Sequence, residues 1–190
     1  MRIWGAILAG GASTRMGAHK PLLPFRRGKL IDAVIVRAAP QVERLAIDVP
    51  ADMAEHYPYT DVLPDLHAEK LGPLCGVVTA LAWCEAEWLA TFPCDTPFLP
   101  RDLVAQLAAK ARDTPVVAAH EGRVHPICAL WPKTALAGLR DEIARFRTMR
   151  TTLQAFGAVE CEIAAATHAF FNVNTPDDLD EALRLSGRED

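Results

Sequence analysis

Short apolar runs alternate with segments of helical periodicity along the sequence, and this alternation is the feature that most limits the possible folds. The runs predicted as strands lie at 3–8, 44–49, 62–63, 88–92, 116–119, 127–131 and 159–163. The segments predicted as helices repeat their apolar residues every three or four positions, at 30–39, 74–85, 101–111, 134–145, 149–156 and from 176 onward. Such alternation predicts a three-layer α/β/α fold with a mostly parallel central sheet.

The 190 residues are expected to form one domain, residues 1–190, because no linker, repeat or low-complexity segment divides them. A content of 51% hydrophobic and 23% charged residues excludes a disordered chain. The net charge of −4 gives no support to a nucleic-acid partner, which usually needs a basic surplus. A small phosphorylated ligand stays possible, since it needs only a local cluster of positive groups.

The five cysteines form neither a CxxC pair nor a spacing typical of zinc sites, which favours reduced thiols in a cytosolic protein. The apolar run at residues 1–8 is too short for a signal peptide. No apolar run approaches the roughly 20 residues that a membrane helix needs. We therefore expect a cytoplasmic location and no membrane partner.

The loop after the first strand carries the strongest functional signal. Gly10 and Gly11 allow the backbone to approach a ligand closely and to turn its N–H groups toward phosphate oxygens. Arg15 and Lys20 add two cations to the same loop. The spacing fits neither the P-loop nor the G-x-G-x-x-G dinucleotide pattern. The loop is suited to a triphosphate; the alternative is a glycine-rich turn with solvated charges.

Residues 8–20 read Leu-Ala-Gly-Gly-x-Ser-x-Arg-Met-Gly-x-x-Lys, which resembles the signature of nucleotidyltransferases that couple an NTP to a phosphorylated partner. Within that superfamily the chain is similar to the MobA family of molybdenum cofactor guanylyltransferases. The similarity recurs at Asp65 with Gly72-Pro73-Leu74-x-Gly76, at Pro93-Cys94-Asp95-Thr96-Pro97, at His125-Pro126 and at Phe171-Asn172-Val173-Asn174-Thr175-Pro176. It implies a Rossmann-like nucleotidyltransferase fold, with Mg²⁺ as cofactor and GTP and molybdopterin carrying molybdenum as substrates.

Asp95 is the candidate metal ligand. It directly follows a predicted strand, and carboxylate oxygens are what Mg²⁺ prefers, although an aspartate between two prolines can also merely form a turn. The resemblance implies that Asp95 holds the metal and that Arg15 and Lys20 neutralise the departing pyrophosphate. The GTP site that it implies contains Leu8, Ala9, Gly10, Gly11, Lys20, Asp48, Asp65 and Asp95.

Asp48 departs from the family, which tends to have asparagine at this position. An ionised aspartate accepts hydrogen bonds and donates none, so the sequence gives less support to a nucleotide contact at Asp48 than at the other positions.

Asn172 and Asn174 are the candidates for the acceptor side. If the segment around Val173 is extended after a strand-like stretch at 169–171, both amides lie on one face. The resemblance implies contact there with molybdopterin or with the metal-bound phosphates. It assigns the pterin phosphate to a basic segment that contains Arg147, with Arg150 close by. The alternative is that the two asparagines shape the turn before the last helix, which Thr175 caps.

Three functional alternatives stay open from the sequence. They are the same transfer with CTP, a transfer to a sugar phosphate, and a nucleotide-binding protein without catalysis. The resemblance also implies transient contacts with the molybdenum-insertion protein and with the molybdoenzymes that receive the product.

Overall fold

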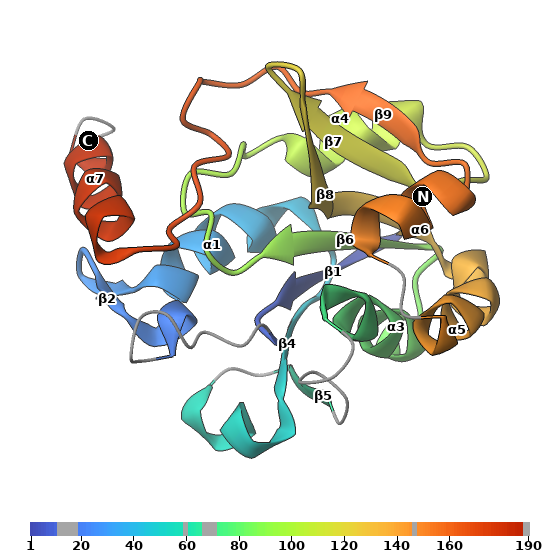
Figure 1. Ribbon diagram of the computed structural model, residues 1–190, viewed down its shortest axis with the longest axis horizontal. Helices are drawn as coiled ribbons and strands as arrows, with labels where there is room; N and C mark the ends of the chain where they lie inside the picture. The colour runs from blue at the N-terminus through green and yellow to red at the C-terminus, as the bar shows by residue number, and fades with distance from the viewer. Residues whose placement is uncertain (11–18, 59–60, 66–71, 146–147, 188–190) are drawn as a thin grey trace.

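A seven-stranded mixed sheet forms the centre of the protein (Figure 1). The computed structural model describes residues 1–190 except 11–18, 59–60, 66–71, 146–147 and 188–190. In sheet order the strands are β5 (Val62–Asp65), β4 (Leu45–Pro50), β1 (Ile3–Leu8), β6 (Trp88–Pro93), β8 (Arg123–Pro132), β7 (Val116–His120) and β9 (Val159–Glu162). Strand β8 runs antiparallel to both of its neighbours and the other pairs are parallel, which confirms the predicted mostly parallel sheet.

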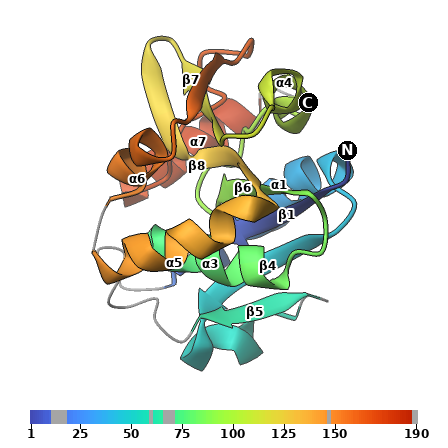
Figure 2. The same ribbon diagram turned by 90° about the vertical axis from the view of Figure 1, so that its right-hand side faces the viewer.

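Helices cover both faces of the sheet, as the three-layer prediction requires (Figures 1 and 2). One face carries α1 (Leu30–Ala38) and α4 (Leu103–Lys110). The other face carries α3 (Pro73–Trp83), α5 (Leu136–Ala144) and α6 (Met149–Ala155). The last helix, α7 (Pro176–Ser186), packs beside α1 and the small hairpin of β2 (Pro24–Phe25) and β3 (Gly28–Lys29). Short 3₁₀ segments complete the fold at Lys20–Leu22, Ala39–Gln41, Ala51–His56 and Lys133–Ala135.

Strand β1 shows why its sequence is apolar without interruption. Ile7 packs into the core under α1 and α4, whereas Trp4, Ala6 and Leu8 pack into the core under α3, α5 and α6. Because successive side chains of a strand point to opposite faces, a strand covered on both sides is apolar at every position. The apolar run that precedes the first loop is therefore a central strand, and packing on both faces of the sheet holds its end in place.

The structure corrects several predicted boundaries. Strand β5 continues through Pro64 to Asp65, which is possible because it lies at the edge of the sheet. Strand β8 begins at Arg123, since Glu121 and Gly122 both have positive φ (49° and 74°) and close a tight hairpin with β7. The helix expected at 134–145 begins as a 3₁₀ turn, and 167–170 form a turn where an extended stretch was expected. The β2–β3 hairpin was not predicted.

Among the described residues, no helix combines the length and the apolar character needed to cross a membrane.

Candidate active site

Three parallel strands bring the sequence motifs to one edge of the sheet. In the register of the sheet, Leu8 at the end of β1 lies between Asp48 of β4 and Pro93 of β6. The backbone N–H of Ala9 donates to the carbonyl oxygen of Asp48 (2.8 Å), so the first loop leaves the sheet beside that residue. Ligands of parallel α/β sheets bind beyond the carboxyl ends of the strands, and this edge is therefore the expected site.

Lys20 and Asp95 form an ion pair at this edge. The Lys20 Nζ donates to Asp95 Oδ2 (2.7 Å) and to Asn174 Oδ1 (2.9 Å), which joins segments 75 and 154 residues apart in the chain. Both side chains of the pair are largely buried, with 15% and 17% of their surface exposed. Reduced access of water strengthens such a pair compared with one on the open surface. Three residues predicted for function therefore meet at one point.

Asn172 joins the same cluster through Thr96. The Thr96 Oγ1 donates to Asn172 Oδ1 (2.5 Å) and lies 3.3 Å from Asp95 Oδ1. The backbone N–H of Val173 donates to the Asp95 carbonyl oxygen (2.9 Å), and the Val173 side chain is buried while both asparagines are exposed. This arrangement agrees with the alternation predicted for the segment.

The start of α7 fixes the backbone at Asn174. The Asp178 carboxylate accepts from the backbone N–H groups of Asn174 and Thr175 (2.9 Å each), and the Thr175 side chain accepts from the Asp178 N–H (3.1 Å). These hydrogen bonds, that of the Asn174 N–H first, hold the pKa of Asp178 below its ordinary value. The predicted cap of the last helix thus also positions the backbone of Asn174, whose side chain accepts from Lys20.

A second pair of acidic side chains lies on the other side of β1: Asp48 is in β4, two residues before its end and against Gly76 of α3, and Asp65 is the last residue of β5. Asp48 is 1% and Asp65 4% exposed, and Asp48 Oδ1 is buried without a hydrogen-bond partner among the described residues. Gly76 packs so closely against the Asp48 carboxyl that a side chain there would collide with it. Burial, followed by the nearby Asp65, raises the pKa of Asp48 to about 8, and burial with Asp65 as hydrogen-bond acceptor raises the pKa of Cys75 to about 12.

Asp48 is consequently a neutral carboxylic acid near pH 7. A protonated carboxyl group has one O–H donor and a remaining acceptor, as an amide has a donor and an acceptor. In its protonated form, Asp48 therefore resembles the asparagine typical of the family more closely than an ionised aspartate would.

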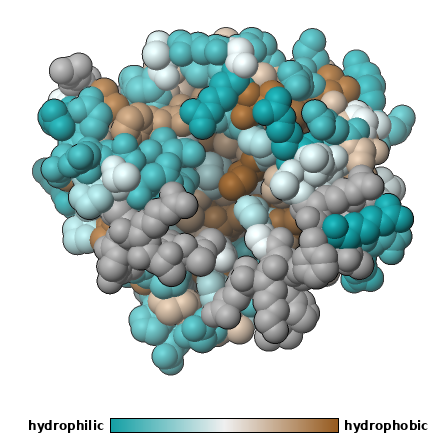
Figure 3. Space-filling view, in the orientation of Figure 1, coloured by the Kyte–Doolittle hydropathy of each residue, from teal (hydrophilic) through white to brown (hydrophobic). Residues whose placement is uncertain are grey.

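A pocket of about 140 Å³ opens beside Asp95, Thr96 and Asn172, and Arg123 and His125 of β8 line its other side. In Figure 3, the face of the molecule seen in Figure 1 is hollowed at its centre, with apolar surface inside the hollow.

Phe170 also lines this pocket, and the His125 ring stacks on it, with 4.1 Å between centroids and 20° between planes. Burial, helped by the Arg123 cation, lowers the pKa of His125 to about 4, so its imidazole is neutral near pH 7. Arg123 and Phe170 were missed from the sequence; the His125-Pro126 motif was the available signal.

The remaining residues predicted for the site lie at the end of β1, away from Asp95, or outside the described part of the chain. Leu8 and Ala9 are buried at the end of β1, and Gly10 follows them. Gly11, Arg15 and Arg147 lie outside the described residues. Arg150 lies within α6 and lines a separate small hollow with Val124 and Leu153.

The donor set at this corner fits a hard cation with few protein ligands. Among the described residues no group of three or more His, Cys, Asp or Glu side chains could enclose a metal. Asp95, Asn172 and Asn174 supply oxygen atoms, and Mg²⁺ in nucleotide sites commonly binds through one or two carboxylates together with substrate phosphates and water. Burial raises the pKa of the adjacent Cys94 thiol, which favours its protonated form.

Known proteins resemble the chain over nearly its whole length. The profile of the MobA-like NTP transferase domain matches residues 5–168. The molybdenum cofactor guanylyltransferase of Mesorhizobium japonicum is 40% identical over 202 residues, covering 96% of this chain and 95% of its own.

Two solved structures share the fold. Molybdopterin-guanine dinucleotide biosynthesis protein A of Archaeoglobus fulgidus has a TM-score of 0.81 at 22% identity, over 97% of this chain and 99% of its own. The Rv0371c protein of Mycobacterium tuberculosis, crystallised with manganese, has a TM-score of 0.68 at 20% identity, over 97% and 98%.

Proposed function

This chain belongs to the family of MobA-like NTP transferases, and we propose that it transfers GMP from GTP to the terminal phosphate of molybdopterin carrying molybdenum. The products are the guanine dinucleotide form of the cofactor and pyrophosphate. The observation that carries the proposal is the convergence of Lys20, Asp95, Asn172 and Asn174 at the carboxyl edge of the sheet, beside the first loop.

The reaction is an in-line displacement at the α-phosphorus of GTP. An oxygen of the pterin phosphate forms the new bond to phosphorus while the bond to the bridging α–β oxygen breaks and pyrophosphate leaves. A phosphate monoester is already a nucleophile, so the protein needs no general base, and catalysis rests on positioning and on charge stabilisation.

Lys20 is the cation that pairs with Asp95 at the proposed phosphate site. Its ammonium group, held 2.7 Å from Asp95, can exchange one carboxylate contact for a phosphate oxygen without leaving the site. Arg15 has the same role in the proposal, as a second cation on the leaving pyrophosphate.

Asp95 would hold Mg²⁺ together with the phosphates of the substrate, and Asn172 and Asn174 offer further oxygen atoms nearby. When bound, the metal supplies positive charge to the phosphoryl oxygens as negative charge develops on them. The ion pair with Lys20 keeps the Asp95 carboxylate oriented while the site is free of substrate.

The nucleoside part of GTP is assigned to the other side of β1. We assign the backbone of Leu8, Ala9, Gly10 and Gly11 to the phosphates. Beyond β1, Asp48 lies in β4, two residues before its end, and Asp65 is the last residue of β5. The unpartnered Asp48 Oδ1 is a polar atom that a nucleoside could satisfy, and the neutral acid can both donate and accept there.

The acceptor is assigned to the pocket between Asp95 and Arg123. The neutral His125–Phe170 stack offers a flat surface to the planar pyrimidine ring of the pterin, and the Arg123 guanidinium offers positive charge to the pterin phosphate. Asn172 lines the same pocket as Asp95 and accepts from the neighbouring Thr96, so we place the meeting point of the two substrates there. Arg147 is proposed as a further phosphate contact.

The test is to mix the protein with Mg²⁺, molybdopterin carrying molybdenum and each of the four NTPs in turn, and to measure pyrophosphate and the dinucleotide product. We expect release with GTP and little with the other nucleotides. Preference for CTP would instead identify a cytidylyltransferase, and release with sugar phosphates alone would identify a sugar-phosphate enzyme. Binding of GTP without any release with either acceptor would make the protein a non-catalytic nucleotide binder.

A further inference from the structure

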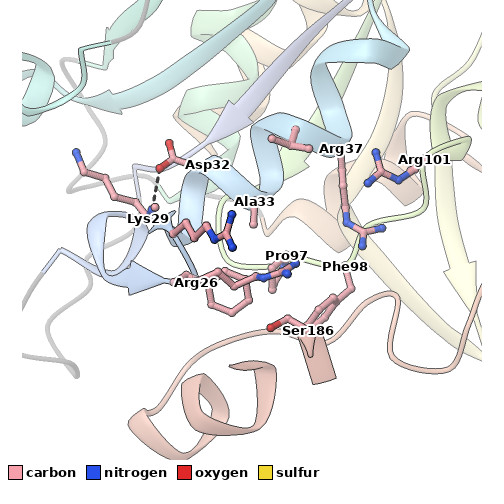
Figure 4. A pocket seen from close by; sticks show the side chains of 13 residues that line it. Arg26, Lys29, Asp32, Ala33, Arg37, Pro97, Phe98, Arg101 and Ser186 are labelled. Carbon is pink, nitrogen blue, oxygen red and sulfur yellow. Dashed lines mark hydrogen bonds between the residues drawn. The ribbon is translucent and has the colours of Figure 1, made fainter. Parts of the chain in front are cut away.

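A basic pocket of about 270 Å³ lies between the β2–β3 hairpin, the outer side of α1 and the segment that follows Thr96 (Figure 4). Four arginines line it: Arg26 and Arg27 from the hairpin, Arg37 from α1, and Arg101 before α4. In Figure 4, Arg26 lies at one end, Arg37 and Arg101 lie at the other, and Lys29 points outward. None of these residues belongs to the cluster around Asp95.

The charge of this pocket is unbalanced. Among the residues that line the pocket, Asp32 is acidic, whereas four arginines and Lys29 are basic, so the carboxylate offsets one of five positive charges. Within the described part of the chain, Arg27 and Arg101 form no ion pair. Positive charge therefore gathers here although the whole chain has a net charge of −4. Such a field attracts anions over a distance of several ångströms.

The pocket is also well formed. A Cβ atom on Gly28 would lie 2.6 Å from Asp32 Oδ2, so glycine lets the hairpin pack closely on α1. Arg26 has φ of 53°, in the left-handed region that favours glycine, which makes this arginine a strained choice for the turn. The buried rings of Phe25 and Phe98 meet edge to face, with 6.4 Å between centroids, and both line the pocket.

We propose that this pocket binds a small phosphate-type anion, such as pyrophosphate or inorganic phosphate, at a site separate from Lys20 and Asp95. Arginine guanidinium groups match the oxygen atoms of phosphate in a two-pronged geometry. The volume suits one or two phosphoryl groups and is below the roughly 300–1,000 Å³ typical of sites for larger ligands. The proposal does not depend on the transferase reaction, since it concerns other residues.

The bound anion would connect the two segments that carry active-site residues. The hairpin follows the Lys20–Leu22 turn, and Pro97 and Phe98 follow Asp95 and Thr96 directly. An anion held by Arg27 and Arg101 therefore ties together the stretches that position the Lys20–Asp95 pair. We expect it to stabilise the folded protein in proportion to its concentration.

The experiment measures the binding of pyrophosphate by titration calorimetry in Lys20→Ala protein, in which phosphate binding at the active site is weakened. In this background we compare the Arg27→Ala, Arg101→Ala double variant with Arg140→Ala, which removes a charge from an exposed residue of α5 on the other face of the sheet. We expect one binding site in the background protein, an unchanged affinity with Arg140→Ala, and a loss of roughly tenfold or more in the double variant. Parallel titrations with inorganic phosphate and with GTP identify which phosphate source binds.

Equal affinities in the double variant and the Arg140→Ala control would overturn the proposal. So would binding of an acidic polyglutamate peptide in the absence of any binding of the phosphate compounds, because the pocket would then be a protein-docking surface. Thermal unfolding of each variant without ligand checks the fold, and a rise of the melting temperature with pyrophosphate that the double variant loses supports the site independently.

Discussion

Asp95 and Asp48 occupy comparable places on either side of β1, yet their surroundings are opposite. Asp48 lies beside Leu8 in the register of β4, and Asp95 follows two residues after Pro93, the partner of Leu8 on β6. Asp95 keeps 17% of its side chain exposed and is paired with Lys20, whereas Asp48 is 1% exposed and has Asp65 as its charged neighbour. The fold brings both carboxyl groups to the carboxyl edge of the sheet, and the neighbouring groups determine the protonation state of each.

The comparison separates two kinds of chemistry within one site. A carboxylate beside a cation and amide oxygens can serve a metal and phosphates. A neutral carboxylic acid can donate a hydrogen bond, which an ionised group cannot. The same substitution, aspartate to asparagine, should therefore have different consequences at the two positions.

The largest expected effect is that of Asp95→Asn on turnover. The amide keeps the size of the side chain but lowers its negative charge, so we expect pyrophosphate release to fall by roughly a hundredfold or more at limiting Mg²⁺. Folding should be retained, as judged by thermal unfolding. Near-normal release at limiting Mg²⁺ would show that Asp95 is not the metal ligand.

Asp48→Asn should instead change the pH dependence of stability. Because the pKa of Asp48 is raised from 3.8 to about 8, the folded wild-type chain holds a proton that the unfolded chain releases above pH 4. Its stability is therefore fully present below about pH 4 and declines as the pH rises to about 8, on the order of a few kcal/mol in total.

Asparagine does not titrate, so the variant lacks this decline. The free energy of unfolding of Asp48→Asn, measured in urea, should rise relative to wild type between pH 5 and pH 9. Asp113→Asn, at an exposed position, is the control and should follow wild type. Parallel curves for Asp48→Asn and wild type would mean that Asp48 is ionised throughout and that the comparison with Asp95 fails.

The sequence predicted the parts of this comparison that depend on chain position. The apolar runs at 44–49 and 88–92 were sufficient to place Asp48 in one strand, close to its end, and Asp95 just after another. Strands that are covered on both faces are apolar throughout and are therefore visible in the sequence. The alternation around Val173 likewise predicted the shared face of Asn172 and Asn174, because side-chain direction in an extended segment has a period of two.

What the sequence could not supply were contacts between distant segments. The protonation of Asp48 depends on its burial beneath Gly76 and on Asp65, which no local pattern encodes. The pocket that we propose for the acceptor depends on the β7–β8 hairpin, which brings Arg123 to the same cavity as Phe170, and the start of β8 at Arg123 was missed. Short-range rules give elements and faces, whereas a charge state depends on what the whole fold packs around a group.

Lys20→Ala sharpens the comparison by removing the cation that distinguishes Asp95 from Asp48. The lost contact is to a charged phosphate and is worth about 1.5–3 kcal/mol, so GTP affinity should fall roughly tenfold to hundredfold. Guanosine, which has no phosphate, should bind almost as before. Lys110→Ala, at an exposed residue of α4, is the matched control for both ligands in calorimetry. Equal losses for GTP and guanosine would place Lys20 away from the phosphates.

The smallest expected effect comes from Asn172 and Asn174, the residues that we predict to contact the acceptor. Their side chains bond to Thr96 and Lys20 and flank the buried Val173. Replacing both by alanine should leave GTP affinity nearly unchanged and lower the rate at subsaturating molybdopterin by about tenfold, the effect of losing one or two neutral hydrogen bonds. GTP titration and turnover at varied molybdopterin are measured on the same preparation. Weak GTP binding with an unchanged dependence on molybdopterin would move both amides to the nucleotide side. A lower melting temperature with both functions intact would mean that the two asparagines only shape the turn before α7. Of the three residues, Asp95 alone would then keep a role in substrate binding.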